Sequence, residues 1–540
     1  MCAVSCVGDL DTMPLDKSVS SSDKAFAAPE SYLQYVNYAY SYFSLVSQTD
    51  PGSSDIAVSD AGQSEFTRQY MVLNEMSTDA LKCVWGDSYV PEIGYDRWNS
   101  SNTAVVAVYL RSLKAIAICN QFLDESVSGD AAVSERGHAA EIENVHTYRA
   151  ELRLLRAVYY SFLLDLFGNP PLILPEHIGS SDFPKQLSTD FAEGRRMLFE
   201  WIESELNASI ADPALPERPV TYPRLSKYAA KAVLARMYLN AEVYTGTTRW
   251  QDAMNAAKDV IDNGGYTLCP VYQNLFLQDN STNGAQNEFI IAACYDDHQT
   301  QSWGGTTHLV YSVVHADTRM AISQAVGSGT DIYKNQWNGY HVSEAFIEEN
   351  FGLTNVEAGP YLKHGGDQRA LLYKFEAPFT NEVTDITSGW TCLKWLPITS
   401  DGTPVLVNDD IEQSSADFPF YRLAEMYLIY AEAELRLNSN TNNSYPYLQA
   451  LRDRAGIPIG TTETIDLDWI LKERVRELMW EGHRRTDLIR YGYFTTSSYP
   501  WPYKAGVPDG RASLDSHLEV YPIISTDLVA NPNLVQNPGY

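Results

Sequence analysis

"RLSKYAAKAVLARMYLNAEVY" at 224–244 and "RWQDAMNAAKDVIDNG" at 249–264, joined by "TGTT", predict a helix–turn–helix unit. Small side chains along the first helix let a neighbouring helix pack at close range, and the second helix continues the packing. The positions that carry this pattern are Ala229, Ala230, Ala232, Ala235, Trp250, Ala253 and Ala256. The pattern is typical of a tetratricopeptide-type repeat.

A second unit of the same kind stands much later in the chain, with "YRLAEMYLIYAEAELRLN" at 421–438 and "YPYLQALRDRAG" at 445–456. Apolar periodicity predicts further helices at 30–46, 103–126, 146–168 and 188–210. The repeats are degenerate and widely separated, so we expect no regular solenoid. The sequence therefore predicts an all-α fold built on a degenerate tetratricopeptide-like helical frame.

The helical period is lost between residues 265 and 418, where Gly, Asn, Thr and Asp become frequent and tryptophans are interspersed. A stretch of about 150 residues is too long for a simple loop, so we predict a large irregular ligand-binding lobe here. We divide the chain into a leader and tether (1–25) and a single domain (26–540). Within that domain we expect a helical frame at about 26–50, 103–264 and 419–492, variable segments at about 51–102 and 265–418, and a tail at 493–540.

The composition of the 540 residues limits the possible partners. The net charge is −30, from 69 acidic and 39 basic residues, and such a surface disfavours nucleic acid. No run approaches the roughly 18 apolar residues of a membrane-spanning helix. Tyr outnumbers Phe by 35 to 18, and Tyr suits half-wet recognition surfaces better than a dry core.

Motifs for catalysis or cofactor binding are not found in the sequence. It contains no G-x-S-x-G, HExxH or phosphate-binding glycine loop, and its seven cysteines lack zinc spacing. "EGHRRTDL" at 481–488 admits two interpretations: an acid–base pair formed by His483 and a carboxylate, or an ion-pair network that locks the last helices onto the frame. We favour the network, and expect no enzyme activity, no cofactor and no metal.

Two stretches fit the chemistry of sugar binding. A pyranose presents apolar C–H faces to aromatic rings, while its hydroxyls need donors and acceptors at the rim. The first stretch, residues 75–102, offers Trp98, Asn102, Asp79 and Trp85; the second, "NQWNGYHV" at 335–342, offers Trp337 and Asn338. For each tryptophan the alternative is a packed structural role.

The N-terminal stretch "MCAVSCVGDLDTMPLD" predicts a lipid anchor at Cys6. Small residues precede Cys6, and an acidic, Pro-containing tether follows it, as at the end of a bacterial lipoprotein signal. The alternative is an exposed cysteine in an unmodified leader.

Five pieces occurring in one order, together with this leader, resemble the RagB/SusD family. They are "RAELRLLRAVYYSFLLDLFGNPPLI" (149–173), "YRLAEMYLIYAEAELRLN" (421–438), "LRDRAGIP" (451–458), "ILKERVRELMWEGHRRTDLIRYG" (470–492) and "YPIISTDLVANPNLVQNPGY" (521–540). The resemblance covers almost the whole chain. It implies about four tetratricopeptide-like helix pairs in an outer-membrane, surface-exposed lipoprotein of Bacteroidetes, lipidated at Cys6.

The resemblance also implies a function: capture of an oligo- or polysaccharide and its delivery to a SusC-like TonB-dependent transporter. The family's aromatic ligand residues match Trp98 with Asn102, Tyr295 and Trp337 here. Two alternatives stay open at this point. One is a protein-binding scaffold of the transporter that touches no glycan, and the other is a helical glycoside hydrolase.

Overall fold

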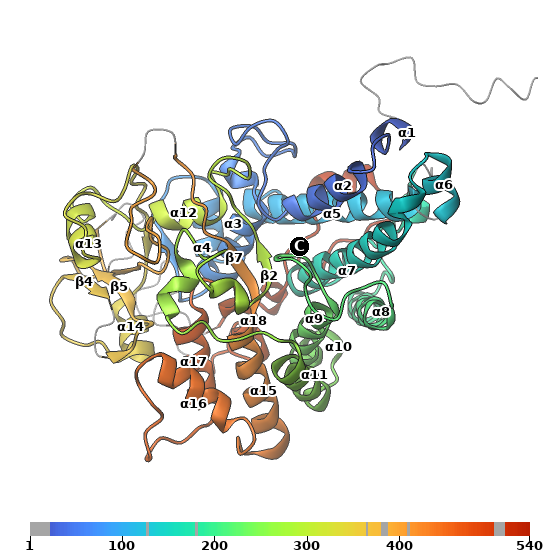
Figure 1. Cartoon of the computed structure of the whole chain (residues 1–540). Helices are drawn as coiled ribbons and strands as arrows, with labels where there is room; N and C mark the ends of the chain where they lie inside the picture. The colour runs from blue at the N-terminus through green and yellow to red at the C-terminus, as the bar shows by residue number, and fades with distance from the viewer. Residues whose placement is uncertain are drawn as a thin grey trace, which may run out of the picture.

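The computed structural model of the chain describes residues 22–125, 129–178, 182–362, 366–379, 387–407, 411–499, 501 and 513–540 (Figure 1). The helices are α1 (Ser22–Ala25), α2 (Ser31–Ser41), α3 (Phe66–Met71), α4 (Tyr89–Gly94), α5 (Thr103–Glu125), α6 (Gly129–Glu135), α7 (Ile142–Phe167), α8 (Phe191–Ala211), α9 (Lys227–Leu239), α10 (Ala241–Thr245), α11 (Trp250–Asn263), α12 (Gly305–Tyr311), α13 (Arg319–Ala325), α14 (Glu344–Phe351), α15 (Leu423–Asn438), α16 (Tyr445–Arg454), α17 (Leu467–Leu478), α18 (Arg484–Arg490) and α19 (Ser525–Ala530).

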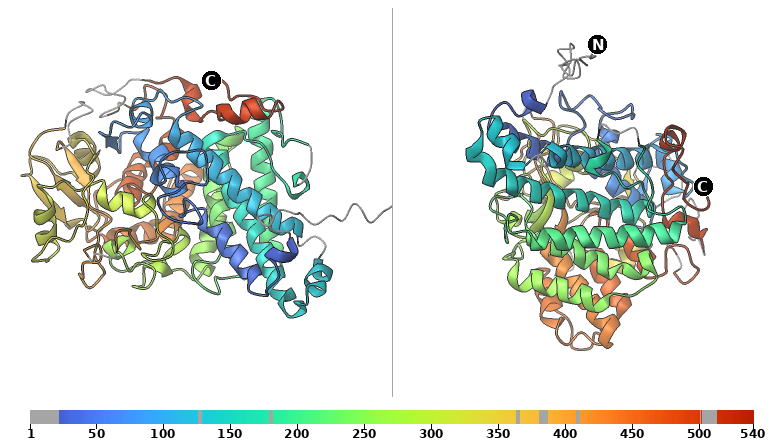
Figure 2. Two further views of the ribbon diagram at one scale, coloured as in Figure 1. Left: turned by 90° about the horizontal axis from the view of Figure 1, so that it is seen from above. Right: turned by 90° about the vertical axis from the view of Figure 1, so that its right-hand side faces the viewer.

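The helical frame is a succession of helices in which each packs on the next. Helix α5 contacts α7, α7 contacts α8, α8 contacts α9, α9 contacts α11, and α11 contacts α15. Figure 2 shows these helices from the side as successive layers. Close packing between α9 and α11 uses small residues, since Ala229, Ala232 and Ala253 of the predicted pattern are fully buried. On α11 the next fully buried position is Ala257, whereas the predicted Ala256 is partly buried. The predicted helix-rich, tetratricopeptide-like fold is confirmed.

Helix α5 differs from our expectation about hydropathy. Its segment Thr103–Asp124, with mean hydropathy 1.3, is by length and composition apolar enough to cross a membrane. However, 61% of the most apolar window is buried inside the protein. Its two basic residues, Arg111 and Lys114, both bind the carboxylate of Asp55, at 2.5 and 2.6 Å. The packing is that of a core helix of the frame.

The segment that lost the helical period is not simply irregular. The antiparallel strands β2 (Phe289–Ala293) and β7 (Phe418–Arg422) pair with each other, and the residues between them form a separate part of the structure. We call residues 294–417 the lobe; Figure 1 shows much of it in yellow, beside the frame. The lobe holds α12 to α14 and the sheet β4 (Gly359–Leu362), β5 (Leu371–Lys374) and β6 (Trp390–Cys392), while β3 (Tyr340–His341) pairs with β1 (Lys82–Cys83).

Buried ion pairs join the lobe to the frame. The carboxylate of Glu477 on α17 meets Arg422 at 2.6 Å, Arg369 of the lobe at 3.3 Å, and Arg454. Lys394 of the lobe meets Glu481 at 2.5 Å. We call the whole set the central ion-pair network: Glu288, Asp367, Arg369, Lys394, Arg422, Arg452, Arg454, Glu473, Arg476, Glu477 and Glu481. The ion-pair interpretation of this C-terminal region is confirmed.

The first testable consequence concerns Glu477. Replacing Glu477 with Gln leaves buried guanidinium groups without their shared carboxylate, so we expect the free energy of unfolding to fall by about 3–5 kcal/mol. Urea denaturation followed by circular dichroism measures it. The matched control is Glu200→Gln, because Glu200 pairs with Arg196 on the exposed surface of α8 and should change stability by no more than about 0.5 kcal/mol. Equal effects of the two substitutions would contradict the structural role of the network.

Stability should also depend on pH with a maximum near pH 4.5 to 5. Burial raises the pKa of Glu65 to about 8, that of Glu75 to about 8 and that of Asp417 to about 6. As pH rises from the unfolded pKa toward these values, the unfolded chain ionises first, so the folded protein loses stability. For Glu473, burial is outweighed by Arg369 and its neighbours, and the pKa falls from 4.5 to about 2. Stability from Glu473 is therefore lost as pH falls below 4.5. Thermal midpoints between pH 3 and 9 test this; a maximum above pH 7 would refute it.

Candidate functional site

An open hollow of about 510 Å³ lies where three segments distant in sequence meet. We call it the tryptophan hollow, because three indole rings line it. Its lining residues are Gly52, Ser59, Asp60, Ala61, Gly62, Gln63, Arg68, Trp85, Asp87, Trp303 and Trp337. The rings of Trp85, Trp303 and Trp337 are half-buried, so part of each remains open to solvent.

Strand pairing brings two of these rings together. Strands β1 and β3 place Cys83 opposite Tyr340, and the Trp85 indole then donates to the carbonyl oxygen of Asn338 at 2.9 Å. Gly339 has φ +111°, and a Cβ there would lie 2.2 Å from the Trp85 indole nitrogen. Only glycine therefore lets the Trp85 ring lie against this turn.

The remaining wall is a tilted pair of rings. The centroids of Trp303 and Trp337 are 6.2 Å apart, with 42° between the planes, and Trp337 also packs on Tyr311 at 5.3 Å. The indole faces thus form a bent apolar surface rather than a flat one. Such a surface suits a ligand that has apolar faces and changes direction along its length.

The polar groups of the hollow are dominated by Arg68. This residue is only 6% exposed, and its guanidinium carbon lies 5.5 Å from the centroid of the Trp85 ring. In the described residues its side chain makes one hydrogen bond, a long one of 3.3 Å to the Tyr89 hydroxyl, and its Nε has no partner. At the rim the Gln63 amide donates to Asp87 at 2.9 Å. A buried cation with unused donors favours a ligand rich in acceptors.

Not all the residues predicted from sequence reach the hollow. Trp85 and Trp337 line it, and Asn338 lies directly behind them with φ +52°. Trp98 is only 4% exposed: its indole donates to the Tyr540 hydroxyl at 2.6 Å, and its ring packs on Tyr521. In this position the ring of Trp98 offers no face to a ligand.

Three further predicted residues have structural partners. Asn102 caps α5, accepting from the N–H of Ala104 at 3.0 Å and donating to Glu92 at 2.7 Å. Asp79 binds Arg484 through both carboxylate oxygens at 2.8 Å. Tyr295 is buried, and its hydroxyl hydrogen-bonds to Glu65. We therefore leave Trp98, Asn102, Asp79 and Tyr295 out of the proposed ligand contacts.

Sequence reasoning missed Trp303 and Arg68. Trp303 ends "CYDDHQTQSW" (294–303), whose Asp and His residues indicated a solvated loop, and the glycines that follow it give no motif. Arg68 belongs to α3, where a basic residue in a helix is unremarkable without its surroundings. One feature of the sequence could have identified Trp303: it stands next to polar residues in a loop, as Trp85 does in residues 85–87.

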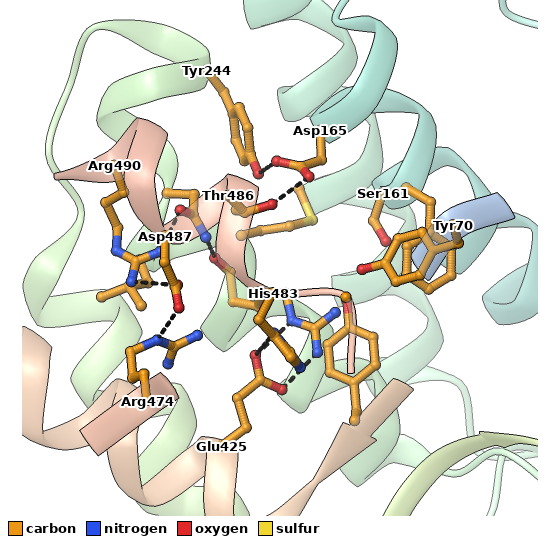
Figure 3. A pocket seen from close by; sticks show the side chains of 17 residues that line it. Tyr70, Ser161, Asp165, Tyr244, Glu425, Arg474, His483, Thr486, Asp487 and Arg490 are labelled. Carbon is orange, nitrogen blue, oxygen red and sulfur yellow. Dashed lines mark hydrogen bonds and ion pairs between the residues drawn. The ribbon is translucent and has the colours of Figure 1, made fainter. Parts of the chain in front are cut away.

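His483 lies in a buried polar cluster, drawn in Figure 3, and not in an open site. The enclosed space is about 20 Å³, room for one water molecule. Asp487 binds Arg474 and Arg490, each at 2.8 Å, and the His483 ring lies 3.8 Å from Glu425. Burial, followed by neighbouring cations, holds the pKa of His483 well below its ordinary value, so the ring stays neutral. This arrangement serves packing between helices.

Cys6 lies outside the described residues. The cysteines within them, Cys83, Cys119, Cys269, Cys294 and Cys392, are free thiols. In the same part of the chain no three His, Cys, Asp or Glu side chains are placed to share a metal ion.

Fold and site together define a class: a helical-repeat protein that carries an open, tryptophan-lined hollow between residues 52–87 and its lobe. A profile of the SusD family matches residues 232–540. Over 579 aligned positions the chain is 32% identical to the starch-binding protein SusD of Bacteroides thetaiotaomicron, which covers 99% of this chain and 96% of that protein. The chain belongs to the SusD family.

Other relatives agree with this assignment. A SusD-like protein of Formosa agariphila, P25, is 25% identical, covering 79% of this chain and 78% of its own. A SusD superfamily protein of Parabacteroides distasonis has the same fold, with TM-score 0.66, 20% identity, and coverage of 95% and 99%. A surface glycan-binding protein A of B. thetaiotaomicron, solved with laminarihexaose, aligns with TM-score 0.65, 20% identity, and coverage of 94% and 99%. The two B. thetaiotaomicron proteins are named for binding starch and surface glycan.

Gly339 provides a test of how the hollow is built. Gly339→Ala should push the Trp85 ring out of place, because the new methyl group would overlap the indole. In protein labelled with 5-fluorotryptophan, the ¹⁹F resonance of Trp85, assigned through Trp85→Phe, should shift or broaden. The control is Gly327→Ala, where φ is also positive (+88°) but no atom lies within 4 Å of the new Cβ. An unchanged Trp85 resonance in Gly339→Ala would contradict the geometry described.

Proposed function

We propose that the tryptophan hollow binds an oligosaccharide without cleaving it. The observation that carries this proposal is one hollow lined by three partly open indole rings, Trp85, Trp303 and Trp337, and by the buried guanidinium of Arg68. Family membership and the starch- or glycan-binding names of the relatives support it.

Each part of the hollow has a counterpart on a pyranose. The apolar C–H faces of successive sugar rings stack on the indoles and leave water. The guanidinium of Arg68 donates two parallel N–H groups to neighbouring hydroxyls of one sugar, which suits its forked geometry. Gln63 and Asp87 at the rim hydrogen-bond to further hydroxyls. Water removed from each hydroxyl offsets part of the gain, so we expect weak to moderate affinity per site.

The shape of the apolar surface favours a curved glycan. Because the Trp303 and Trp337 planes are tilted by 42°, a chain that turns between sugars contacts both rings, whereas a flat ribbon contacts one. We therefore infer an α-linked glucan, of which maltoheptaose is a soluble example, in preference to a flat β-1,4-linked glucan. The starch-binding relative, 32% identical, supports this choice.

For the cellular setting we propose a surface-exposed outer-membrane lipoprotein anchored at Cys6. It captures glycan and passes it to a SusC-like TonB-dependent transporter. The support for this is family membership and the sequence around Cys6. A shallow, open hollow is suited to handing a ligand on, because the sugar can leave along the surface.

Calorimetric titration with maltoheptaose, laminarihexaose and cellohexaose tests the glycan proposal. We expect maltoheptaose to bind best, and Trp303→Ala, Trp337→Ala and Arg68→Ala each to weaken it by about tenfold or more. The control is Trp250→Ala, because Trp250 is half-buried on the frame helix α11 beside Arg436, far in the fold from the hollow. Absence of binding to all three sugars, or an equal loss in the control, would overturn the proposal.

A further inference from the structure

A buried carboxyl group lies directly behind the Trp303 wall of the hollow. Glu65 precedes α3 and is 0% exposed. Its side chain accepts from the backbone N–H of Arg68 and is hydrogen-bonded to the hydroxyl of Tyr295. The N–H of Gly305, two residues after Trp303, also hydrogen-bonds to it. One carboxyl group thus contacts the elements that carry both Arg68 and Trp303.

The Glu65 carboxyl group and the segment that follows Trp303 are closely packed. A Cβ at Gly304 would lie 2.0 Å from an oxygen of Glu65, and a Cβ at Gly305 would lie 2.0 Å from the Tyr295 hydroxyl. On the other side, a Cβ at Gly62 would lie 3.0 Å from the carbonyl oxygen of Trp303. The backbone at Trp303 to Gly305 therefore lies closely packed between Gly62 and the Glu65–Tyr295 pair.

We propose that Glu65 is a positioning residue of the hollow, which couples sugar binding to the presence of one proton on its carboxyl group. This inference rests on the proposed glycan-binding function. In the neutral form the carboxyl group accepts hydrogen bonds from the Tyr295 hydroxyl and the Gly305 N–H, and so supports the Trp303 segment. Loss of the proton to solvent places a full negative charge behind the wall. That charge attracts the Arg68 guanidinium and draws it away from the sugar, because burial leaves the charge poorly screened by water.

Among the charged and titratable groups around Glu65, we expect only its own carboxyl group to lose a proton near pH 8. Facing it are Arg68 from α3, Tyr295 after β2 and, through the Tyr295 N–H, Asp417; Asp60 acts on it through Arg68. Burial raises the pKa of Glu65 to about 8, while hydrogen bonds from Tyr295 and Arg68 act in the opposite direction.

Other buried groups near the hollow keep one state between pH 7 and 9.5. Burial raises the pKa of Cys83 to about 12 and that of Tyr340 well above its ordinary value. Burial and then Arg68 hold the pKa of His308 well below its ordinary value. Glu75 also has a pKa of about 8, but its carboxyl group faces the N–H groups of Gly482 and His483. Glu75 is therefore a natural control.

The experiment is a titration of the full chain with maltoheptaose from pH 6.5 to 9.5. Affinity of the unaltered protein should fall about thirtyfold between pH 7 and 9.5, because binding requires the protonated carboxyl group, whose pKa burial raises to about 8. Glu65→Gln keeps the shape and cannot ionise, so it should bind at all pH values like the unaltered protein at pH 7. Glu75→Gln should keep the pH dependence. A flat profile in the unaltered protein, or an unchanged slope in Glu65→Gln, overturns the inference.

A second measurement separates this inference from the glycan proposal, since it needs no sugar. In protein labelled with 5-fluorotryptophan, the ¹⁹F resonance of Trp303, assigned through Trp303→Phe, should titrate with a midpoint near pH 8. It should not titrate in Glu65→Gln. If no sugar binds but Trp303 titrates, the glycan proposal fails and the positioning role stands. If sugar binds and Trp303 does not titrate, the positioning role fails.

Discussion

The buried carboxylate of Glu477 is the constraint on which the assembly of this protein depends. Its three guanidinium partners come from the lobe (Arg369), from the strand that ends the lobe (Arg422) and from the end of α16 (Arg454). Burial opposes its charge, but these cations hold the pKa of Glu477 well below the ordinary range. Removing the charge of Glu477 is costly, because each of its guanidinium partners would then be left as an unpaired charge in the protein interior. The network therefore fixes how lobe and frame meet.

That constraint reaches the tryptophan hollow through a short path. Just beyond Glu477 the chain turns at Trp480, where φ is +61°, and the Trp480 indole donates to the carbonyl oxygen of Ala80 at 2.9 Å. The same ring packs against Tyr340 at 5.7 Å. Ala80 precedes β1 and Tyr340 belongs to β3, and the pairing of these strands sets Trp85 against the Trp337 turn. Rigid buried charge at the centre thus supports a half-exposed apolar surface at the rim.

The frame could be predicted from sequence because its physics is local. The apolar period of residues 224–264 and the stop at Gly168, where φ is +70°, are each visible within one or two helical turns. The lobe could not be predicted in the same way. Strands of two to five residues, such as β2 and β7 with every residue buried, show no alternation of polar and apolar positions. β2 and β7 lie more than 100 residues apart in the sequence, so only the tertiary structure shows that they pair.

The same reasoning explains why only some of the predicted site residues line the hollow. Trp98 and Trp85 stand in one stretch, each near polar residues, yet Asn102 serves as a helix cap and Trp98 faces the core, whereas Trp85 faces solvent. Local composition cannot distinguish the two, since the difference lies in which neighbours cover the ring.

Arg68 and Glu65 are buried groups that lower the stability of the protein. A nearly unpartnered cation and a carboxyl group forced toward its neutral form both lower stability at neutral pH, and a fold optimised for stability alone would have replaced them. Arg68 lies against the Trp85 ring and Glu65 against the segment that follows Trp303, so the loss of stability arises at the hollow.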